Sequence, residues 1–240
     1  MKRYNILDDI RGFAVINMVL YHFLWDVVYL GGIAIDWYSA LPGYIWQQGI
    51  CWAFILLSGF CWSLGRHRLR RGLIVFVCGA VVTIVTVLVM PKNCIVFGIL
   101  TMLGSCMLLM IPLEKLLRHC KCEIGLVVSG LLFAAARNIY NGSLWLGKIE
   151  LPEWLYRNYF TAFLGFPQKE FFSTDYFPLL PWIFLFIAGY FLYRIFEKYK
   201  LLGILEHRGL RPLEWIGCHA LGIYLVHQPI LSICFIGGLT

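Results

Sequence analysis

The sequence predicts an all-α integral membrane protein, a polytopic bundle of about seven transmembrane helices. Hydrophobic residues make up 60% of the 240 positions and charged residues only 14%, whereas soluble domains are about 45–50% apolar and about 25% charged. Mean hydropathy is +0.77. Apolar runs of about 20 residues, the length that crosses a bilayer, recur along the chain. We expect residues 1–240 to form a single transmembrane domain.

Seven apolar runs are the candidate spans. They are expected at residues 10–30, 44–64, 72–90, 95–113, 123–140, 178–196 and 214–237. Charged residues interrupt the start of the first run and no small-residue cleavage site follows it, so we expect it to stay as a helix rather than act as a signal peptide. The seventh run contains Gly217, Cys218, His219, Gly222 and Pro229, and we expect it to be bent.

Basic residues cluster after the second, fourth and sixth runs. These clusters are Arg66, Arg68, Arg70 and Arg71, then Lys115, Arg118 and Lys121, then Arg194, Lys198, Lys200, Arg208 and Arg211. Because cytoplasmic loops carry an excess of Lys and Arg, the N-terminus is predicted in the cytoplasm and the C-terminus outside, in a multi-pass protein of the cell membrane. These loop clusters account for the net charge of +7, so the charge does not indicate a nucleic-acid partner.

The one long polar stretch, residues 141–177, is rich in aromatic residues such as Trp145, Trp154 and Tyr159. Aromatic rings with scattered charges are typical of segments that lie at a membrane interface. We expect an external loop with short helices anchored at the outer surface; a lid over a site is the alternative.

Ionisable residues inside spans are rare and usually mark sites or pathways. Asp8 and Arg11, spaced to meet on one helix face, lie near the cytoplasmic end of the first run. They are either an ion pair that anchors the helix or an anion site, since the guanidinium fork suits phosphate. His22 lies about 16 Å further along, and Asp26 follows one turn later. A carboxylate bonded to one imidazole nitrogen leaves the other free to act as a base, so the pair is a candidate catalytic site.

Two further places carry candidate site residues. Tyr224, His227 and Gln228 precede Pro229, which frees a backbone carbonyl and favours a broken helix that lines a site. Trp182 opens the sixth run just after a proline, where it is either an interface anchor or part of a site wall.

An ordered set of motifs resembles the heparan-α-glucosaminide N-acetyltransferase-like family, within the transmembrane acyltransferase superfamily. It comprises DDIRGFAVINMVLYHFLWD at 8–26, FILLSGF at 54–60, FGILTMLG at 97–104, FPLLPWI at 177–183 and LGIYLVHQP at 221–229. The resemblance covers nearly the whole chain. His22 is similar to the first-helix histidine of bacterial members, and Asp8 and Arg11 match positions near the cytoplasmic end.

The resemblance implies a membrane acyltransferase. Acetyl-CoA, the acyl donor, would bind from the cytoplasm, and the acetyl group would pass to an amine or hydroxyl of a sugar or glycan outside. In this hypothesis His22 is the base or nucleophile and Asp26 orients it. Asp8, Arg11, Arg66, Arg70 and Arg71 hold the CoA, while His227, Gln228, Trp182 and Tyr224 line the acceptor side. Acceptor identity, acyl chain length, a covalent intermediate and homo-oligomer formation stay open.

Two alternatives involve no acyl transfer. His22 and His227 on different helices could be axial ligands of a b-type haem, and buried polar groups in a helix bundle also occur in glycan or lipid transporters. Nine cysteines lie mostly in apolar runs without a CxxC pair, so we expect structural thiols and no metal.

Overall fold

The computed structural model describes residues 4–206 and 209–237, and they are mainly helical. Its described residues contain six helices long and apolar enough to cross a membrane, or seven if a helix pair bent by 82° near the C-terminus counts as one span. The predicted all-α polytopic class is confirmed. The chain forms two compact units, residues 1–57 with 197–240 and residues 58–196, which are described separately.

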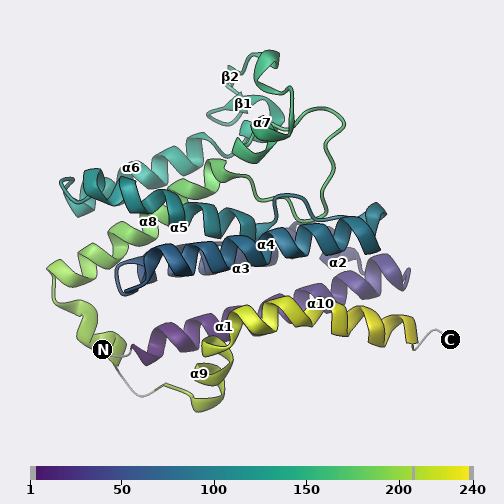
Figure 1. Cartoon of the computed structure of the whole chain (residues 1–240), viewed down its shortest axis with the longest axis horizontal. Coiled ribbons are helices and arrows are strands. Elements are labelled where there is room, and N and C mark those ends of the chain that lie inside the picture. Colours follow the sequence, from purple (N-terminus) through teal and green to yellow (C-terminus); the bar gives the residue numbers. More distant parts are fainter. Residues whose placement is uncertain (1–3, 207–208, 238–240) are drawn as a thin grey trace. The chain divides into compact units, whose positions relative to one another are not determined.

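The first unit is built around the N-terminal helix. Its elements are α1 (Asn5–Trp25), a π-helical turn (Asp26–Leu30), α2 (Asp36–Ser39), the first part of α3 (Leu41–Trp62), a 3-10 helix (Leu201–Glu206), α9 (Arg211–Cys218) and α10 (Ala220–Gly237). Figure 1 shows α1 running beside α9 and α10.

Two glycines allow α1 and α9 to touch through their backbones. A Cβ added at Gly12 would lie 2.2 Å from the carbonyl oxygen of Leu213, and one at Gly217 would lie 2.0 Å from that of Asp8. Small residues at helix contacts permit such close approach in membrane proteins, where van der Waals packing holds helices together. Val15, Met18 and Ile50 form a buried hydrophobic cluster in this unit.

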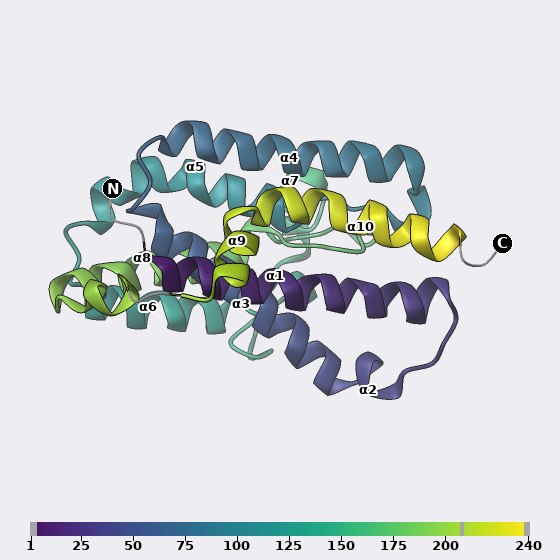
Figure 2. The ribbon, with the colours of Figure 1, turned by 90° about the horizontal axis from the view of Figure 1, so that it is seen from below.

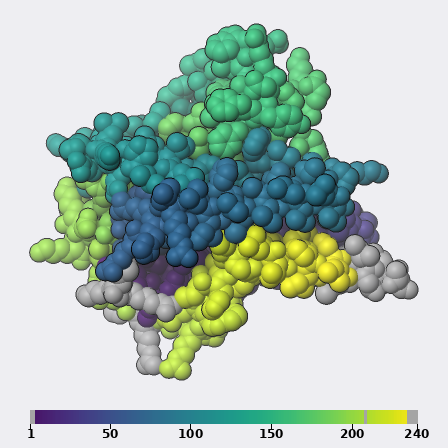
Figure 3. Space-filling model, viewed as in Figure 1, coloured from purple at the N-terminus to yellow at the C-terminus, as the bar shows by residue number. Residues whose placement is uncertain are grey.

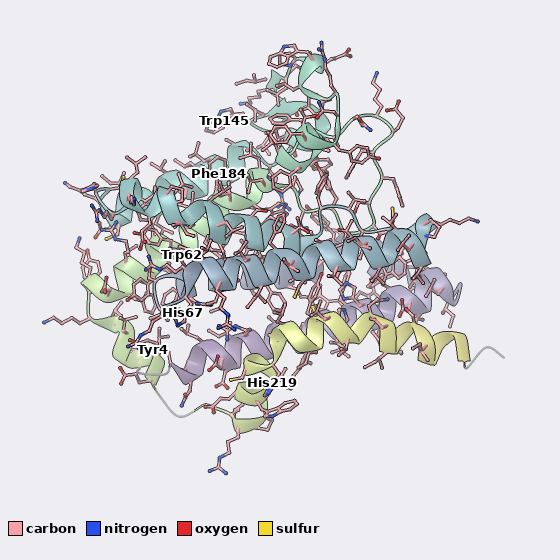
Figure 4. All side chains as sticks on the ribbon, in the orientation of Figure 1. Tyr4, Trp62, His67, Trp145, Phe184 and His219 are labelled. Carbon is pink, nitrogen blue, oxygen red and sulfur yellow. The ribbon has the colours of Figure 1, made fainter. Side chains whose placement is uncertain are left out.

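The predicted bend of the last span is confirmed and lies at His219, one of the residues expected to interrupt it, whereas the break expected at Pro229 is not found. Helix α9 ends at Cys218 and α10 starts at Ala220, with an angle of 82° between them, whereas α10 continues through Pro229. The Nδ1 atom of His219 lies 2.8 Å from the carbonyl oxygen of Trp215, which also accepts from the backbone N–H of His219, so both groups of this residue cap the end of α9. Figure 4 labels His219 at this corner.

The second unit is an assembly of antiparallel helices. Besides the end of α3 it contains α4 (Arg68–Val89), a 3-10 turn (Pro91–Asn93), α5 (Ile99–Leu117), α6 (Cys122–Ala135) and α8 (Leu179–Lys198). Figure 2 shows α4 along α5. Glycines again set the spacing, since Cβ atoms at Gly79 and Gly104 would lie 2.5 Å from the backbone nitrogens of Thr101 and Phe76.

Helix α4 carries an exposed apolar surface. In the space-filling view it lies along the visible face of its unit (Figure 3), and Leu88 and Val89 near its end are 77% and 71% exposed. An apolar exposed helix is stable where lipid rather than water surrounds it, so this surface agrees with a membrane span.

The fourth span lies four residues later than predicted. Helix α5 starts at Ile99 rather than 95, because Phe97 has a left-handed backbone with a φ of 56°. The preceding residues are held outside the helix, where the N–H groups of Ile95 and Val96 donate to the hydroxyls of Thr86 and Ser173. At the other end α5 runs to Leu117 instead of 113, since a membrane helix tolerates the proline at 112.

Residues 139–177 form a lobe beside the helices of the second unit (Figure 1). The lobe contains 3-10 turns (Ile139–Asn141 and Glu153–Leu155), a two-stranded hairpin of β1 (Ser143–Leu144) and β2 (Ile149–Glu150), and α7 (Tyr159–Leu164). Trp145 and Leu146 lie at the hairpin tip, 53% and 80% exposed (Figure 4). These exposed apolar side chains suit the expected membrane-surface position, which stays a prediction.

Candidate functional site

Two histidines from opposite ends of the chain meet in the first unit. The Nδ1 atom of His22, on α1, lies 2.9 Å from Nε2 of His227, on α10, and the two ring centroids are 4.8 Å apart. His227 is buried and His22 is half-buried. The pair forms because α1 and α10 pack side by side, and it joins two residues that the sequence singles out separately.

Hydrogen-bond chemistry assigns the protons of this pair. The Nδ1 atom of His227 lies 2.6 Å from the carbonyl oxygen of Tyr224. A carbonyl oxygen only accepts, so Nδ1 of His227 carries the hydrogen, and Nε2 of the neutral ring bears a lone pair. Nδ1 of His22 must then donate to that lone pair. The neutral pair therefore leaves the second nitrogen of His22, Nε2, with a lone pair of its own.

Asp26 does not bond to His22 as predicted, but to the neighbour of His227. It is fully buried, and its Oδ1 accepts a hydrogen bond of 2.8 Å from the side-chain nitrogen of Gln228. The α-helix gives way to a π-helical turn at Asp26, which changes the direction of the side chain relative to the i, i+4 geometry expected from the sequence. His22 and Asp26 thus belong to two different polar pairs, His22–His227 and Asp26–Gln228.

Aromatic rings lie beside the histidine pair. Tyr21 packs against Tyr38 and Trp46 with centroid distances of 4.9 and 5.4 Å, and Tyr38 donates to the backbone oxygen of Tyr21. Burial raises the pKa of the Tyr38 phenol, an effect to which the nearby tyrosines and Asp26 add. Tyr38 therefore stays a hydrogen-bond donor. Trp46 donates to Asn17, which ties α3 to α1.

Asp8 and Arg11 form the ion pair that their spacing predicts, with 2.7 Å between Arg11 Nη1 and Asp8 Oδ1. The same nitrogen lies 3.5 Å from the carbonyl oxygen of Gly217, near the end of α9. The pair therefore links α1 to the C-terminal end of a neighbouring helix, where a cation is favourable. This contact fits the helix-anchoring interpretation, and the CoA-binding role stays a prediction.

The arginines around the start of α4 divide into two groups. Arg68 pairs with Glu114 of α5 and lies 5.1 Å from the Trp62 ring, so it joins helices within the second unit. The predicted CoA ligands Arg66, Arg70 and Arg71 are exposed, and they form no ion pair within the described part of the chain. Their charges are thus available to an anion.

Two predicted acceptor-side residues make packing contacts in the structure, and their acceptor-side role stays a prediction. Trp182 is 7% exposed and contacts Phe133, Phe177 and the guanidinium of Arg137 in the second unit, so it is a core residue rather than an exposed interface anchor. Tyr224 packs against the core of the first unit, and its backbone oxygen is the partner of His227.

The partners in each polar pair are what sequence reasoning missed. The haem alternative places His22 and His227 at one site, but no local pattern predicts a direct contact between residues 205 positions apart. The contact between the two rings also argues against the hypothesis that His22 and His227 are axial ligands of a haem. Two nitrogens on opposite sides of one metal ion lie about 4 Å apart at about 2 Å per bond, whereas these lie 2.9 Å apart in a direct hydrogen bond. In the described residues His, Cys, Asp and Glu form no cluster of three suited to a metal ion.

Comparison with known proteins identifies the family. No curated protein and no solved structure matches the chain. A family model described as heparan-alpha-glucosaminide N-acetyltransferase, catalytic, matches residues 3–229, which include both histidines and all the candidate site residues. The protein therefore belongs to the family of the heparan-alpha-glucosaminide N-acetyltransferase catalytic domain, a family of membrane acetyltransferases.

Proposed function

We propose that this protein moves an acetyl group from cytoplasmic acetyl-CoA to an amine or hydroxyl of a sugar on the other side of the cell membrane. The observation that carries the proposal is the His22–His227 pair, which leaves a lone pair on His22 Nε2 within a membrane span. Family membership supports the acetyl group, and the histidine pair supplies the base that acyl transfer needs.

In direct transfer, His22 Nε2 takes the proton of the acceptor O–H or N–H as the acceptor atom attacks the thioester carbon. The new C–O or C–N bond forms, the C–S bond breaks, and His22 returns the proton to the CoA sulfur. His227 Nε2 accepts from Nδ1 of His22 throughout and stabilises the imidazolium. In a two-step route His22 Nε2 attacks the thioester carbon, the C–S bond breaks and CoA leaves as its thiolate. The acceptor atom then attacks the acetyl-imidazolium, the C–N bond to His22 breaks, and the acceptor's proton passes to the CoA thiolate.

Arginines are the proposed ligands of the CoA phosphates. Arg66, Arg70 and Arg71 are exposed and without ion pairs in the described chain, and a guanidinium binds phosphate through two parallel hydrogen bonds. Arg11, oriented by Asp8, lies about 16 Å before His22 along α1. Replacing Arg70 and Arg71 together by alanine is expected to raise the KM for acetyl-CoA at least about tenfold.

The decisive test is acetyl-CoA turnover by the purified protein with and without a sugar acceptor. His22→Ala is expected to lower turnover by about 100-fold or more, the range typical of a lost general base. Turnover equal to that of the unmodified protein would remove His22 from the mechanism. Rapid mixing with labelled acetyl-CoA in the absence of acceptor distinguishes the routes, because label on the protein means an acetyl-histidine intermediate.

A further inference from the structure

Two buried oxygen atoms beside the histidine pair have no hydrogen-bond partner in the described part of the chain. They are Oδ2 of Asp26 and Oε1 of Gln228. Buried polar atoms almost always have a partner, since an unpaired one costs the free energy of its lost hydration. Two such atoms on adjacent side chains of a fully buried aspartate and its partner indicate that something else satisfies them.

The chemistry of the two atoms defines what that partner carries. Gln228 donates through its nitrogen to Oδ1 of Asp26, 2.8 Å away, so both side chains are already held in place. The remaining carboxylate and amide oxygens only accept. A phosphate or a thioester carbonyl, which also accept, cannot satisfy them. The missing group is therefore a donor, an O–H or an N–H.

The two oxygens lie near His22, the residue proposed to activate the acceptor substrate. Asp26 follows His22 by four residues, about one helical turn or 6 Å of rise, and Gln228 follows His227 directly. The Asp26–Gln228 pair thus stands next to the His22–His227 pair, since Asp26 begins the π-helical turn that continues α1 and Gln228 lies on α10 with His227. A molecule whose reacting atom lies at His22 has its neighbouring atoms within reach of these oxygens.

We propose that Asp26 and Gln228 bind a second hydroxyl or amine of the acceptor, on a carbon next to the one that receives the acetyl group. The site then selects acceptors with adjacent donor groups, such as the vicinal diols and amino alcohols of a sugar ring, over simple alcohols and amines. This inference rests on the proposed function, and it assigns Asp26 to substrate recognition rather than to the orientation of His22.

The test uses two pairs of small acceptors, and the members of each pair differ only in the neighbouring group. These are trans-1,2-cyclohexanediol against cyclohexanol, and trans-2-aminocyclohexanol against cyclohexylamine. The quantity measured is the ratio of kcat/KM within each pair, with acetyl-CoA as donor. The unmodified protein is expected to favour the vicinal member at least about tenfold, because a site built to bond a donor rejects the analogue that lacks it.

Two variants and one control test whether Asp26 and Gln228 cause the preference for acceptors with a neighbouring donor group. In Asp26→Asn the new amide nitrogen replaces one acceptor oxygen and can donate to Gln228 Oε1, so neither position is left to bind the substrate's donor. In Gln228→Met the acceptor Oε1 is removed. Both are expected to bring the ratio close to one, and either variant suffices if the other fails to fold. Asp36→Asn, at an exposed aspartate of the same unit, should keep the ratio of the unmodified protein.

The outcomes separate the two proposals. Transfer to all four compounds without preference, or a preference that survives both substitutions, would overturn this inference alone. It would mean that a proton on Asp26 or a bound water satisfies the two oxygens. Turnover with a sugar acceptor but with none of the four compounds would also overturn this inference alone. No turnover of acetyl-CoA with these compounds or with a sugar acceptor would overturn the proposed function, and this inference with it.

Discussion

At the scale of single residues, the direction of two successive hydrogen bonds determines which nitrogen of His22 carries a lone pair. The carbonyl oxygen of Tyr224 holds the hydrogen on Nδ1 of His227, and His227 in turn holds the hydrogen on Nδ1 of His22. Only the tautomer of His22 with a lone pair on Nε2 satisfies both contacts when the rings are neutral. In the proposed mechanism His227 is therefore a positioning residue, which acts through His22.

Replacing His227 by phenylalanine is expected to lower kcat for acetyl transfer by about 100-fold, because His22 loses the acceptor that fixes its tautomer and stabilises its charged form. The KM for acetyl-CoA should change little. Steady-state kinetics on the purified protein measure both constants.

A partial recovery separates this positioning role from a purely structural one. In His227→Gln the amide oxygen can accept from His22, so this variant should be several-fold more active than the phenylalanine variant. His67→Phe, at an exposed histidine before α4, is the matched control and should behave like the unmodified protein. Equal activities of the glutamine and phenylalanine variants would count against the tautomer argument.

At the scale of elements, glycines determine how closely helices approach, and that approach sets the site. The contact of α1 with α9 depends on Gly12 and Gly217, and α9 leads through the corner at His219 into α10, which carries His227. A wider spacing of α1 and α9 would move α10 and part the two histidines.

Gly12→Ala is therefore expected to destabilise the protein by about 1–3 kcal/mol, the usual effect of overpacking. The added Cβ would lie 2.2 Å from a backbone oxygen, and a backbone atom cannot rotate away as a side chain can. Gly222→Ala on α10 is the matched control, because no atom lies within 4 Å of its added Cβ.

Thermal unfolding in detergent measures both variants. Alanine favours a helix over glycine by about 0.5–1 kcal/mol, so Gly222→Ala should unfold at the same or a higher temperature. A Gly12→Ala protein as stable as this control would show that α1 and α9 can separate at little cost.

At the scale of the whole molecule, basic side chains of the second unit gather at one end of its helices. Arg194 of α8 donates to the backbone oxygens of Leu117 and Cys120, and Arg68 pairs with Glu114 at the same end of α5. The basic residues that follow three different spans therefore gather at one end of the unit, as expected if that end faces the cytoplasm.

Cysteine labelling tests this orientation. In a cysteine-free chain with Cys120 restored, a membrane-impermeant maleimide is expected to react only after the cells are permeabilised. In the same chain with Leu146→Cys at the tip of the hairpin, it should react with intact cells. Both positions are exposed in the structure, so reversed accessibility would mean the opposite orientation.

The sequence predicts the spans well because the tendency to enter lipid is local. Each window of about 20 residues carries its own hydropathy, and the errors lie where tertiary contacts override it. Helix α5 is displaced by the left-handed Phe97 and by the hydrogen bond of Val96 to Ser173, 77 residues away. The bend of the last span was predicted, but the helix passes its proline and breaks at a histidine instead.

The sequence by itself determined that the chain is a helical membrane protein and that His22, Asp26, His227 and Gln228 are candidate site residues, because polar side chains are costly in lipid and are rare without a purpose. Only the tertiary structure decided their partners. The packing of α1 against α9 and α10, together with the π-helical turn at Asp26, joins histidine to histidine and aspartate to glutamine. Contacts between residues some 200 positions apart depend on how the helices pack, and no local sequence pattern predicts that packing.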